Sequence, residues 1–230
     1  MRGLSEAVSC SRSLRVLAAL LSYPDAELRG YLPEMREVLR SEHALSASRL
    51  AELEALSDAL LRAEALETEA SYVQLFDRGR ATSLHMFEHV HGESRDRGPA
   101  MIDLAQTYEK AGLYLAPGQL PDYLPVVVEF VSTQPPREAR AFLCEMAHIL
   151  NALFNALQQR ESGYASVVGA LLELAGEAVQ PARLAAEEPL DDSWAEPMVF
   201  DGCSSRGQAK PDQPQPIYFV RNEPDSGAAA

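Results

Sequence analysis

The chain has 230 residues, a formal net charge of -14 and a sequence pI of about 4.8. Hydrophobic residues make up 47% and charged residues 23% of it, which is typical of a folded soluble domain and excludes disorder over the whole length. Nucleic-acid affinity comes largely from Lys and Arg that replace counterions, so the acidic balance argues against a nucleic-acid partner and favours a basic one.

Cysteine usage and the N-terminal sequence indicate a cytoplasmic protein. Cys10, Cys144 and Cys203 lie far apart with no CxxC spacing, so the sequence predicts neither a disulfide framework nor a cysteine zinc site. The apolar run 16–21 is too short for a secretory signal peptide. No run of about eighteen apolar residues occurs, so we expect no stable membrane association.

Apolar residues at helical spacing predict a series of helices along the chain. Their approximate ranges are 14–22, 25–40, 46–64, 69–76, 83–91, 99–111, 122–131, 136–160 and 164–178. Asp25, and either Ser46 or Ser48, are the expected N-caps. Pro33 predicts a break or a restart within the second helix. The longest predicted helix is 136–160, which carries a continuous apolar stripe.

The segment 120–131 has the β-branched content of a buried strand. We nevertheless predict a helix, because no second segment offers a pairing partner. Asp122, together with Pro121 and Pro125, is also typical of a helix start. The sequence therefore predicts an all-α fold, in which amphipathic helices form one bundle.

The composition changes after Pro181. Seven of the fifteen prolines lie in the last fifty residues, with an acidic excess and only two short apolar clusters, 194–200 and 217–220. We expect residues 1–180 to form one helical domain and 181–230 to be a largely disordered, flexible tail. The alternatives are that the two clusters pack loosely on the domain, or that they dock on a partner as an adaptor.

A possible metal motif lies in the histidine-rich helix. His85, Glu88 and His89 match H-x-x-E-H, in which two histidines bind zinc and the glutamate activates water. The wheel places the three side chains on the solvent face, opposite a buried face formed by Leu84, Phe87 and Val90. A metal-dependent hydrolase is therefore the alternative function, but the all-helical context and the missing third ligand do not favour it.

Other catalytic patterns are weaker. Two Glu-x-x-His pairs, Glu88 with His91 and Glu145 with His148, are typical of di-iron bundles, but His148 lies opposite the apolar stripe of its helix. No G-x-S-x-G, P-loop or G-x-G-x-x-G occurs. We therefore expect no enzyme, no metal and no cofactor. The outward histidine helix and the charged loop 93–97 then form a surface that suits a peptide.

Several stretches of the sequence together resemble a known family. The stretches 72–80 and 83–98, together with 15–24, 120–125 and 193–197, are similar to the respiratory nitrate reductase molybdenum cofactor assembly chaperones, the delta-subunit family. These belong to the broader class of molybdoenzyme maturation chaperones. The resemblance covers nearly the whole chain.

The resemblance implies an all-helical chaperone that binds the apo catalytic (alpha) subunit of nitrate reductase, including its basic N-terminal peptide. It would keep that subunit competent for molybdenum cofactor and iron-sulfur insertion before membrane attachment, and would be absent from the mature enzyme. Proteins of molybdenum cofactor biosynthesis are further expected partners. The residues expected to contact the client peptide are His85, Glu88, His89, Glu93, Arg95, Asp96 and Arg97, with Asp122 and Glu129 as carboxylates near an apolar groove.

Overall fold

The computed structural model describes residues 10–91 and 94–180, which are helical throughout apart from turns and short connections. The helices are α1 (Ser11–Leu20), α2 (Ala26–Glu42), α3 (Ala47–Arg62), α4 (Ala65–Phe76), the 3-10 turn η1 (Arg80–Thr82), α5 (Met86–His91), α6 (Arg97–Lys110), α7 (Leu124–Ser132), α8 (Pro136–Glu145), α9 (Ala147–Gln159) and α10 (Ala165–Ala175). None of the described helices is both long and apolar enough to cross a bilayer. The predicted all-α fold is confirmed, and the predicted tail lies outside the described residues.

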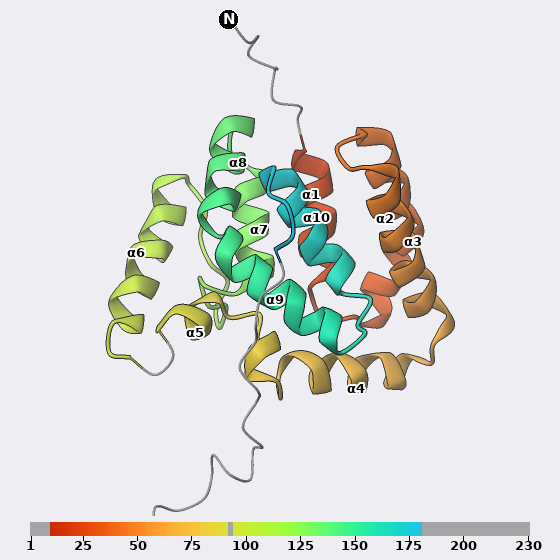
Figure 1. Ribbon diagram of the computed structural model, residues 1–230. Helices are drawn as coiled ribbons and strands as arrows, with labels where there is room; N and C mark the ends of the chain where they lie inside the picture. Colours follow the sequence, from red (N-terminus) through yellow and green to blue (C-terminus); the bar gives the residue numbers. More distant parts are fainter. Residues whose placement is uncertain (1–9, 92–93, 181–230) are drawn as a thin grey trace, which may run out of the picture. The chain divides into compact units, whose positions relative to one another are not determined.

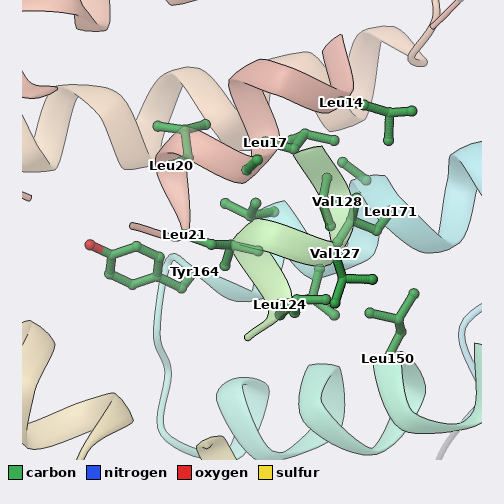
Figure 2. Close-up of a cluster of buried hydrophobic side chains, with 14 of the residues drawn as sticks. Leu14, Leu17, Leu20, Leu21, Leu124, Val127, Val128, Leu150, Tyr164 and Leu171 are labelled. Atoms are coloured by element: carbon green, nitrogen blue, oxygen red, sulfur yellow. The ribbon is translucent and has the colours of Figure 1, made fainter. Parts of the chain in front are cut away.

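The core lies where α1, α7 and α10 meet (Figure 1). Figure 2 shows side chains from these helices pointing toward one another, among them the fully buried Leu17, Val128 and Leu171. Seven of the nine residues of α7 are buried, so this helix is covered on nearly all sides. A helix in that position is apolar all round, which explains its strand-like composition and confirms the predicted helix.

Local capping follows the sequence. The Asp25 carboxylate accepts a hydrogen bond from the Leu28 N–H at 2.8 Å, and the Ser46 hydroxyl accepts one from the Arg49 N–H at 3.3 Å. Each satisfies a first-turn donor that the helix itself cannot pair. Both predicted N-caps are confirmed, and Ser46 rather than Ser48 opens α3.

The predicted break at Pro33 is wrong, because α2 runs through it without interruption. A proline removes one ladder hydrogen bond, and its ring crowds the preceding turn. The turns on either side are fixed by tertiary contacts that offset this cost. Leu32 and Leu39 are buried, and the Arg29 side chain donates to the carbonyls of Leu60 (3.0 Å) and Ala63 (2.5 Å) near the end of α3.

The predicted single helix over 136–160 is also wrong, because Met146 separates α8 from α9. Both halves pack against α10, which has 11 residues and is therefore about 16 Å long. A straight helix of 25 residues would extend about 37 Å and leave much of its apolar stripe uncovered. The apolar pattern cannot reveal the break, because Met146 itself is buried and keeps the stripe in phase.

Candidate functional site

The residues just before α5 cross the start of α7 instead of continuing a helix. The Leu124 N–H donates to the Leu84 carbonyl at 2.8 Å, and the Met86 N–H donates to the Asp122 carbonyl at 3.0 Å. His85 and Tyr123 form the isolated antiparallel bridge at this crossing. Since α5 begins only at Met86, the predicted helix that includes His85 is wrong in its first turn.

The buried face of this segment also differs from the predicted one. Leu84 and Met86 are buried, whereas Val90, which was expected to face the core, is 50% exposed. Phe87 is half-buried and contacts the ring of His91 edge to face. Alternate residues 84 and 86 point inward because the chain is extended here, and the helical wheel does not apply to extended backbone.

Asp122 is fully buried, and its carboxylate holds three groups that follow Ser83 in the chain. The Phe87 N–H donates to it at 3.3 Å, His85 Nδ1 lies 3.4 Å from one oxygen, and Arg97 Nη2 lies 3.6 Å from the other. A buried carboxylate is stable only when it is paired in this way. We term Asp122, His85, Phe87 and Arg97 the Asp122 cluster. It joins α5 and the start of α6 to α7, and Asp122 has no exposed surface of its own.

The hydrogen bond to Asp122 raises the pKa of His85, although partial burial of the ring opposes this. His85 therefore binds its proton more tightly in the folded chain than in the unfolded chain. The resulting stabilisation is complete below the unfolded pKa of about 6.5 and disappears as the pH rises through the higher folded pKa.

We expect the free energy of unfolding to fall between about pH 6 and pH 8.5 by up to about 1 kcal/mol more in the wild type than in His85→Gln, since the side chain is 33% exposed. Urea denaturation at several pH values measures the difference. His148→Gln is the control, because that imidazole is exposed on α9 and bonds the carbonyl of Glu145. An identical pH slope in His85→Gln and the wild type would contradict the expectation.

Glu88 and His89 point to different partners. Glu88 Oε1 lies 3.4 Å from Arg97 Nη2, so Arg97 bridges Glu88 and the buried Asp122. His89 Nε2 lies 2.8 Å from the Ser83 carbonyl. The two imidazoles of the H-x-x-E-H pattern are thus engaged separately. No group of three or more metal-ligating side chains occurs among the described residues.

The charged loop before α6 is only partly described. Ser94 and Asp96 bond each other: the Ser94 hydroxyl donates to the Asp96 carboxylate and accepts from the Asp96 N–H, both at 3.2 Å. Arg95 is exposed, and Glu93 lies outside the described residues. The Asp122 cluster thus places the 94–97 loop beside α5, and Arg95 and Asp96 present both charge signs on its surface.

Glu129 lies apart from this cluster, on the exposed side of α7. It lines two adjoining hollows of about 580 and 290 Å³ between α1, α7 and the loop 111–119, and both hollows also share Arg15, Gln119 and Val126. We term this combined surface the α7 groove. An apolar groove with a carboxylate was expected at this helix, and the structure places Glu129, rather than Asp122, in it.

Tyr123 lies between the Asp122 cluster and the α7 groove. Its place in the site was not predicted from the sequence. Its ring lies 5.4 Å from the His85 ring, and its side chain lines the α7 groove. The residue stands directly after Asp122 in the segment 120–125, so only its position in that segment could have indicated it. Arg15, which also lines the α7 groove, could have been indicated only by its place in the stretch 15–24.

Two further tyrosines, Tyr72 and Tyr164, lie close to Tyr123 in the interior. The Tyr72 hydroxyl donates to the Leu21 carbonyl at 2.6 Å and lies 3.1 Å from the Tyr123 hydroxyl. Tyr72 has only one hydroxyl hydrogen, so Tyr123 is the donor in that pair. The Tyr164 hydroxyl is buried and has no partner among the described residues. Burial raises the pKa of both Tyr72 and Tyr164, which keeps them neutral.

This difference predicts that removing the hydroxyl group has a larger effect at Tyr72 than at Tyr164. Tyr72→Phe should lower the free energy of unfolding by about 1–2 kcal/mol, because it leaves the buried Leu21 carbonyl without a donor. Tyr164→Phe should change stability by less than about 0.5 kcal/mol, because no hydrogen bond is lost. Urea denaturation of both variants measures the two changes in the free energy of unfolding. A loss in Tyr164→Phe as large as that in Tyr72→Phe would contradict the assignment.

With this geometry described, comparisons with known proteins identify the family. The family model for the nitrate reductase delta subunit matches residues 25–168. The chain belongs to the nitrate reductase delta subunit family. It is 42% identical over 200 residues, 86% of this chain and 84% of the relative, to the Escherichia coli K12 nitrate reductase molybdenum cofactor assembly chaperone NarJ.

Two other likenesses are less extensive. The Mycobacterium tuberculosis nitrate reductase-like protein NarX is 35% identical over 155 residues, which are 67% of this chain and 23% of NarX. A crystal structure from Archaeoglobus fulgidus, assigned as a redox enzyme maturation protein, has a TM-score of 0.55 at 17% identity. It covers 77% of this chain and 100% of that chain, and it supports the fold alone.

The family is one of assembly chaperones and not of catalytic enzymes. The chain is therefore a maturation chaperone. The alternative of a metal-dependent hydrolase at His85, Glu88 and His89 is therefore wrong.

Proposed function

We propose that the protein binds the apo catalytic (alpha) subunit of respiratory nitrate reductase and keeps it competent for cofactor insertion. The molybdenum cofactor and the iron-sulfur cluster are cargo of the client in this proposal. The chaperone acts in the cytoplasm, before the client attaches to the membrane, and is not part of the mature enzyme. Membership of the delta-subunit family and the 42% identity to the E. coli assembly chaperone support this role.

The proposed client surface has two parts. One is the exposed elbow formed by α5 and the loop to α6, where Glu88, His89, Arg95 and Asp96 offer both charge signs and hydrogen-bonding groups. The other is the α7 groove with Glu129. The groove has apolar walls, and Arg15 lines it together with Glu129. Its apolar surface and the Glu129 carboxylate suit a peptide that carries apolar and basic residues.

Asp122, His85 and Arg97 have a different role in this proposal. Asp122 is fully buried and holds the other two, so it positions the elbow instead of touching the client. His85 and Arg97 remain about one-third exposed, and their outer surfaces are available to a client. Glu93 belongs to the proposed elbow by its place in the sequence, although it lies outside the described residues.

The mechanism requires binding energy and no bond chemistry. A chaperone shifts its client toward the open, cofactor-accepting state only as far as its affinity for that state exceeds its affinity for the closed one. A preference of about 100-fold corresponds to about 2.7 kcal/mol. Insertion of the cofactor then favours the closed client, which removes the preferred form and releases the chaperone.

Titration with a synthetic peptide from the N-terminus of the client tests the proposed surface. We expect binding in the micromolar range, weakened at least about tenfold by Glu129→Lys and by Glu88→Ala combined with Arg95→Ala. Glu145→Lys is the matched control, since it makes the same charge change as Glu129→Lys on an exposed residue of α8. Absent binding at tens of micromolar, or equal loss in the control, would reject the surface.

Co-purification tests the role itself. From cells that express the nitrate reductase subunits, we expect the protein to carry a cofactor-free catalytic subunit, in a larger amount when molybdenum is withheld. The same preparation shows whether proteins of molybdenum cofactor biosynthesis are bound as well. Recovery of only the cofactor-loaded enzyme, with the chaperone still attached, would contradict the proposal.

A further inference from the structure

Arg15 is the positively charged residue that lines the α7 groove in the described structure. It is exposed on α1 and borders both hollows. Its side chain makes one hydrogen bond within the described residues, to the neutral hydroxyl of Ser132, and no ion pair. By contrast, Arg36, Arg40 and Arg97 each pair with a carboxylate. The charge of Arg15 is therefore left without a counter-charge.

Ser132, at the end of α7, restrains the guanidinium of Arg15. Its side chain is buried, and its hydroxyl donates its one hydrogen to the Glu129 carbonyl at 2.6 Å. The hydroxyl oxygen can then only accept, and Arg15 Nε lies 3.4 Å from it. An arginine held through Nε keeps the donors of its two terminal nitrogens. The contact thus orients Arg15 and leaves most of its donors for a ligand.

Glu129 lies in the same groove and leaves Arg15 unpaired. It borders both hollows as well, yet the two side chains form no ion pair with each other in the described structure. The chain has 34 acidic residues against 20 Lys or Arg, so most of its cations can find a carboxylate of the same chain. Val126 and Phe130 also line the groove, and apolar neighbours strengthen a charge contact made there. The groove therefore offers a ligand one cation and one anion.

We propose that Arg15 is a specificity-determining residue that binds an acidic side chain of the client peptide, while Glu129 binds a basic one. The inference rests on the proposed client role of the α7 groove, and it adds the requirement for a carboxylate. A guanidinium suits this ligand because its planar donors can bind both carboxylate oxygens. A purely basic segment would place like charge against Arg15, so the groove prefers a segment that carries both charge signs.

The test is a double-mutant cycle between the full-length protein and the synthetic N-terminal client peptide. In the peptide, each Asp or Glu is replaced in turn by Asn or Gln, which removes the charge and keeps the shape. In the protein, Arg15→Gln removes the opposite charge. Fluorescence anisotropy should show about fivefold weaker binding to Arg15→Gln. One peptide replacement should cause a similar loss with the wild type and no further loss with Arg15→Gln.

Charge reversal gives a readout that a purely structural role of Arg15 would not change. Arg15→Glu should weaken binding of the unmodified peptide at least about tenfold, because like charges then face each other. Replacing the partner acidic residue of the peptide with Lys should restore most of that affinity. Ser132→Ala should weaken binding by about twofold, since Arg15 loses its restraint and must be ordered on binding.

The matched control is Arg12→Gln, which removes the same charge one turn earlier on α1. Arg12 is exposed and lines neither hollow of the α7 groove. Its replacement should leave peptide affinity within about twofold of the wild type, because only the distant, screened charge changes. Both Arg15→Gln and Arg12→Gln should unfold within about 0.5 kcal/mol of the wild type, since both side chains are exposed.

Several outcomes would overturn the role of Arg15. Equal losses in Arg12→Gln and Arg15→Gln would mean that net charge governs binding, and additive losses with every peptide variant would show that Arg15 contacts no carboxylate. A client peptide without an acidic residue would have the same consequence. If Glu129→Lys still weakens binding in these cases, the proposed client surface stands and only the inference about Arg15 falls. Absent binding to the wild type would reject both.

Discussion

Replacing Asp122 with Ala is expected to lower the free energy of unfolding by about 2–4 kcal/mol, because it removes the only carboxylate that pairs with both His85 and Arg97 in the described structure. The Phe87 N–H loses its acceptor in the same change. Urea denaturation measures the loss, and hydrogen exchange at Phe87 should become faster because α5 is no longer held to α7.

Asp122→Asn separates the charge from the hydrogen bond. The amide oxygen can still accept from the Phe87 N–H, while the ion pairs with Arg97 and His85 are lost, so we expect an intermediate destabilisation. Client-peptide affinity should fall in both variants in proportion to the exchange at Phe87, since Asp122 acts by positioning the elbow. A loss below about 1 kcal/mol in Asp122→Ala, with unchanged exchange, would show that the cluster does not hold α5.

Leu17→Ala should destabilise the protein by about 3–4 kcal/mol. Leu17 is fully buried on α1 where α1 packs against α7, and Figure 2 shows it within the central cluster. Removing three carbon atoms there leaves a cavity that the close-packed neighbours can fill only in part. Thermal or urea unfolding gives the value directly.

The matched control for that cavity is Leu66→Ala on α4. Leu66 is 79% exposed, so the same change in chemistry should alter stability by less than about 0.5 kcal/mol. Because α1 and α7 also form the walls of the α7 groove, Leu17→Ala should weaken client-peptide binding as well. A loss for Leu17→Ala that is no larger than for Leu66→Ala would mean that the α1–α7 contact is not central to the core.

Much of the secondary structure could be predicted from local sequence. The caps at Asp25 and Ser46 depend on one side chain and a donor three residues later, so short-range chemistry is sufficient. The predictions that failed depend on distant partners. α2 continues through Pro33 because the Arg29 side chain anchors it to α3. The helix predicted over 136–160 is interrupted at Met146, where α8 and α9 both pack on the short α10.

The candidate site shows the same division. The stretch 83–98 could be singled out from its residues and its family resemblance, and the structure brings together His85, Glu88, Arg97 and Asp122 from it and from the start of α7. Their individual roles could not be predicted, because the pairing of His85 with Asp122 spans 37 positions in the chain. A helical wheel assumes helical backbone, and the backbone at His85, just before α5, is extended.

The sequence by itself determined the all-α class, most helices, two N-caps and the family, because periodicity, capping chemistry and motifs are local properties of the chain. Only the tertiary structure decided that Asp122 is buried, that His85 lies outside α5, and that Glu129 lines the α7 groove. Burial and pairing depend on which helices meet, and that information is spread over the whole chain. Of the three residues that suggested a zinc site, His85 pairs with Asp122, Glu88 pairs with Arg97, and His89 lies against the Ser83 carbonyl.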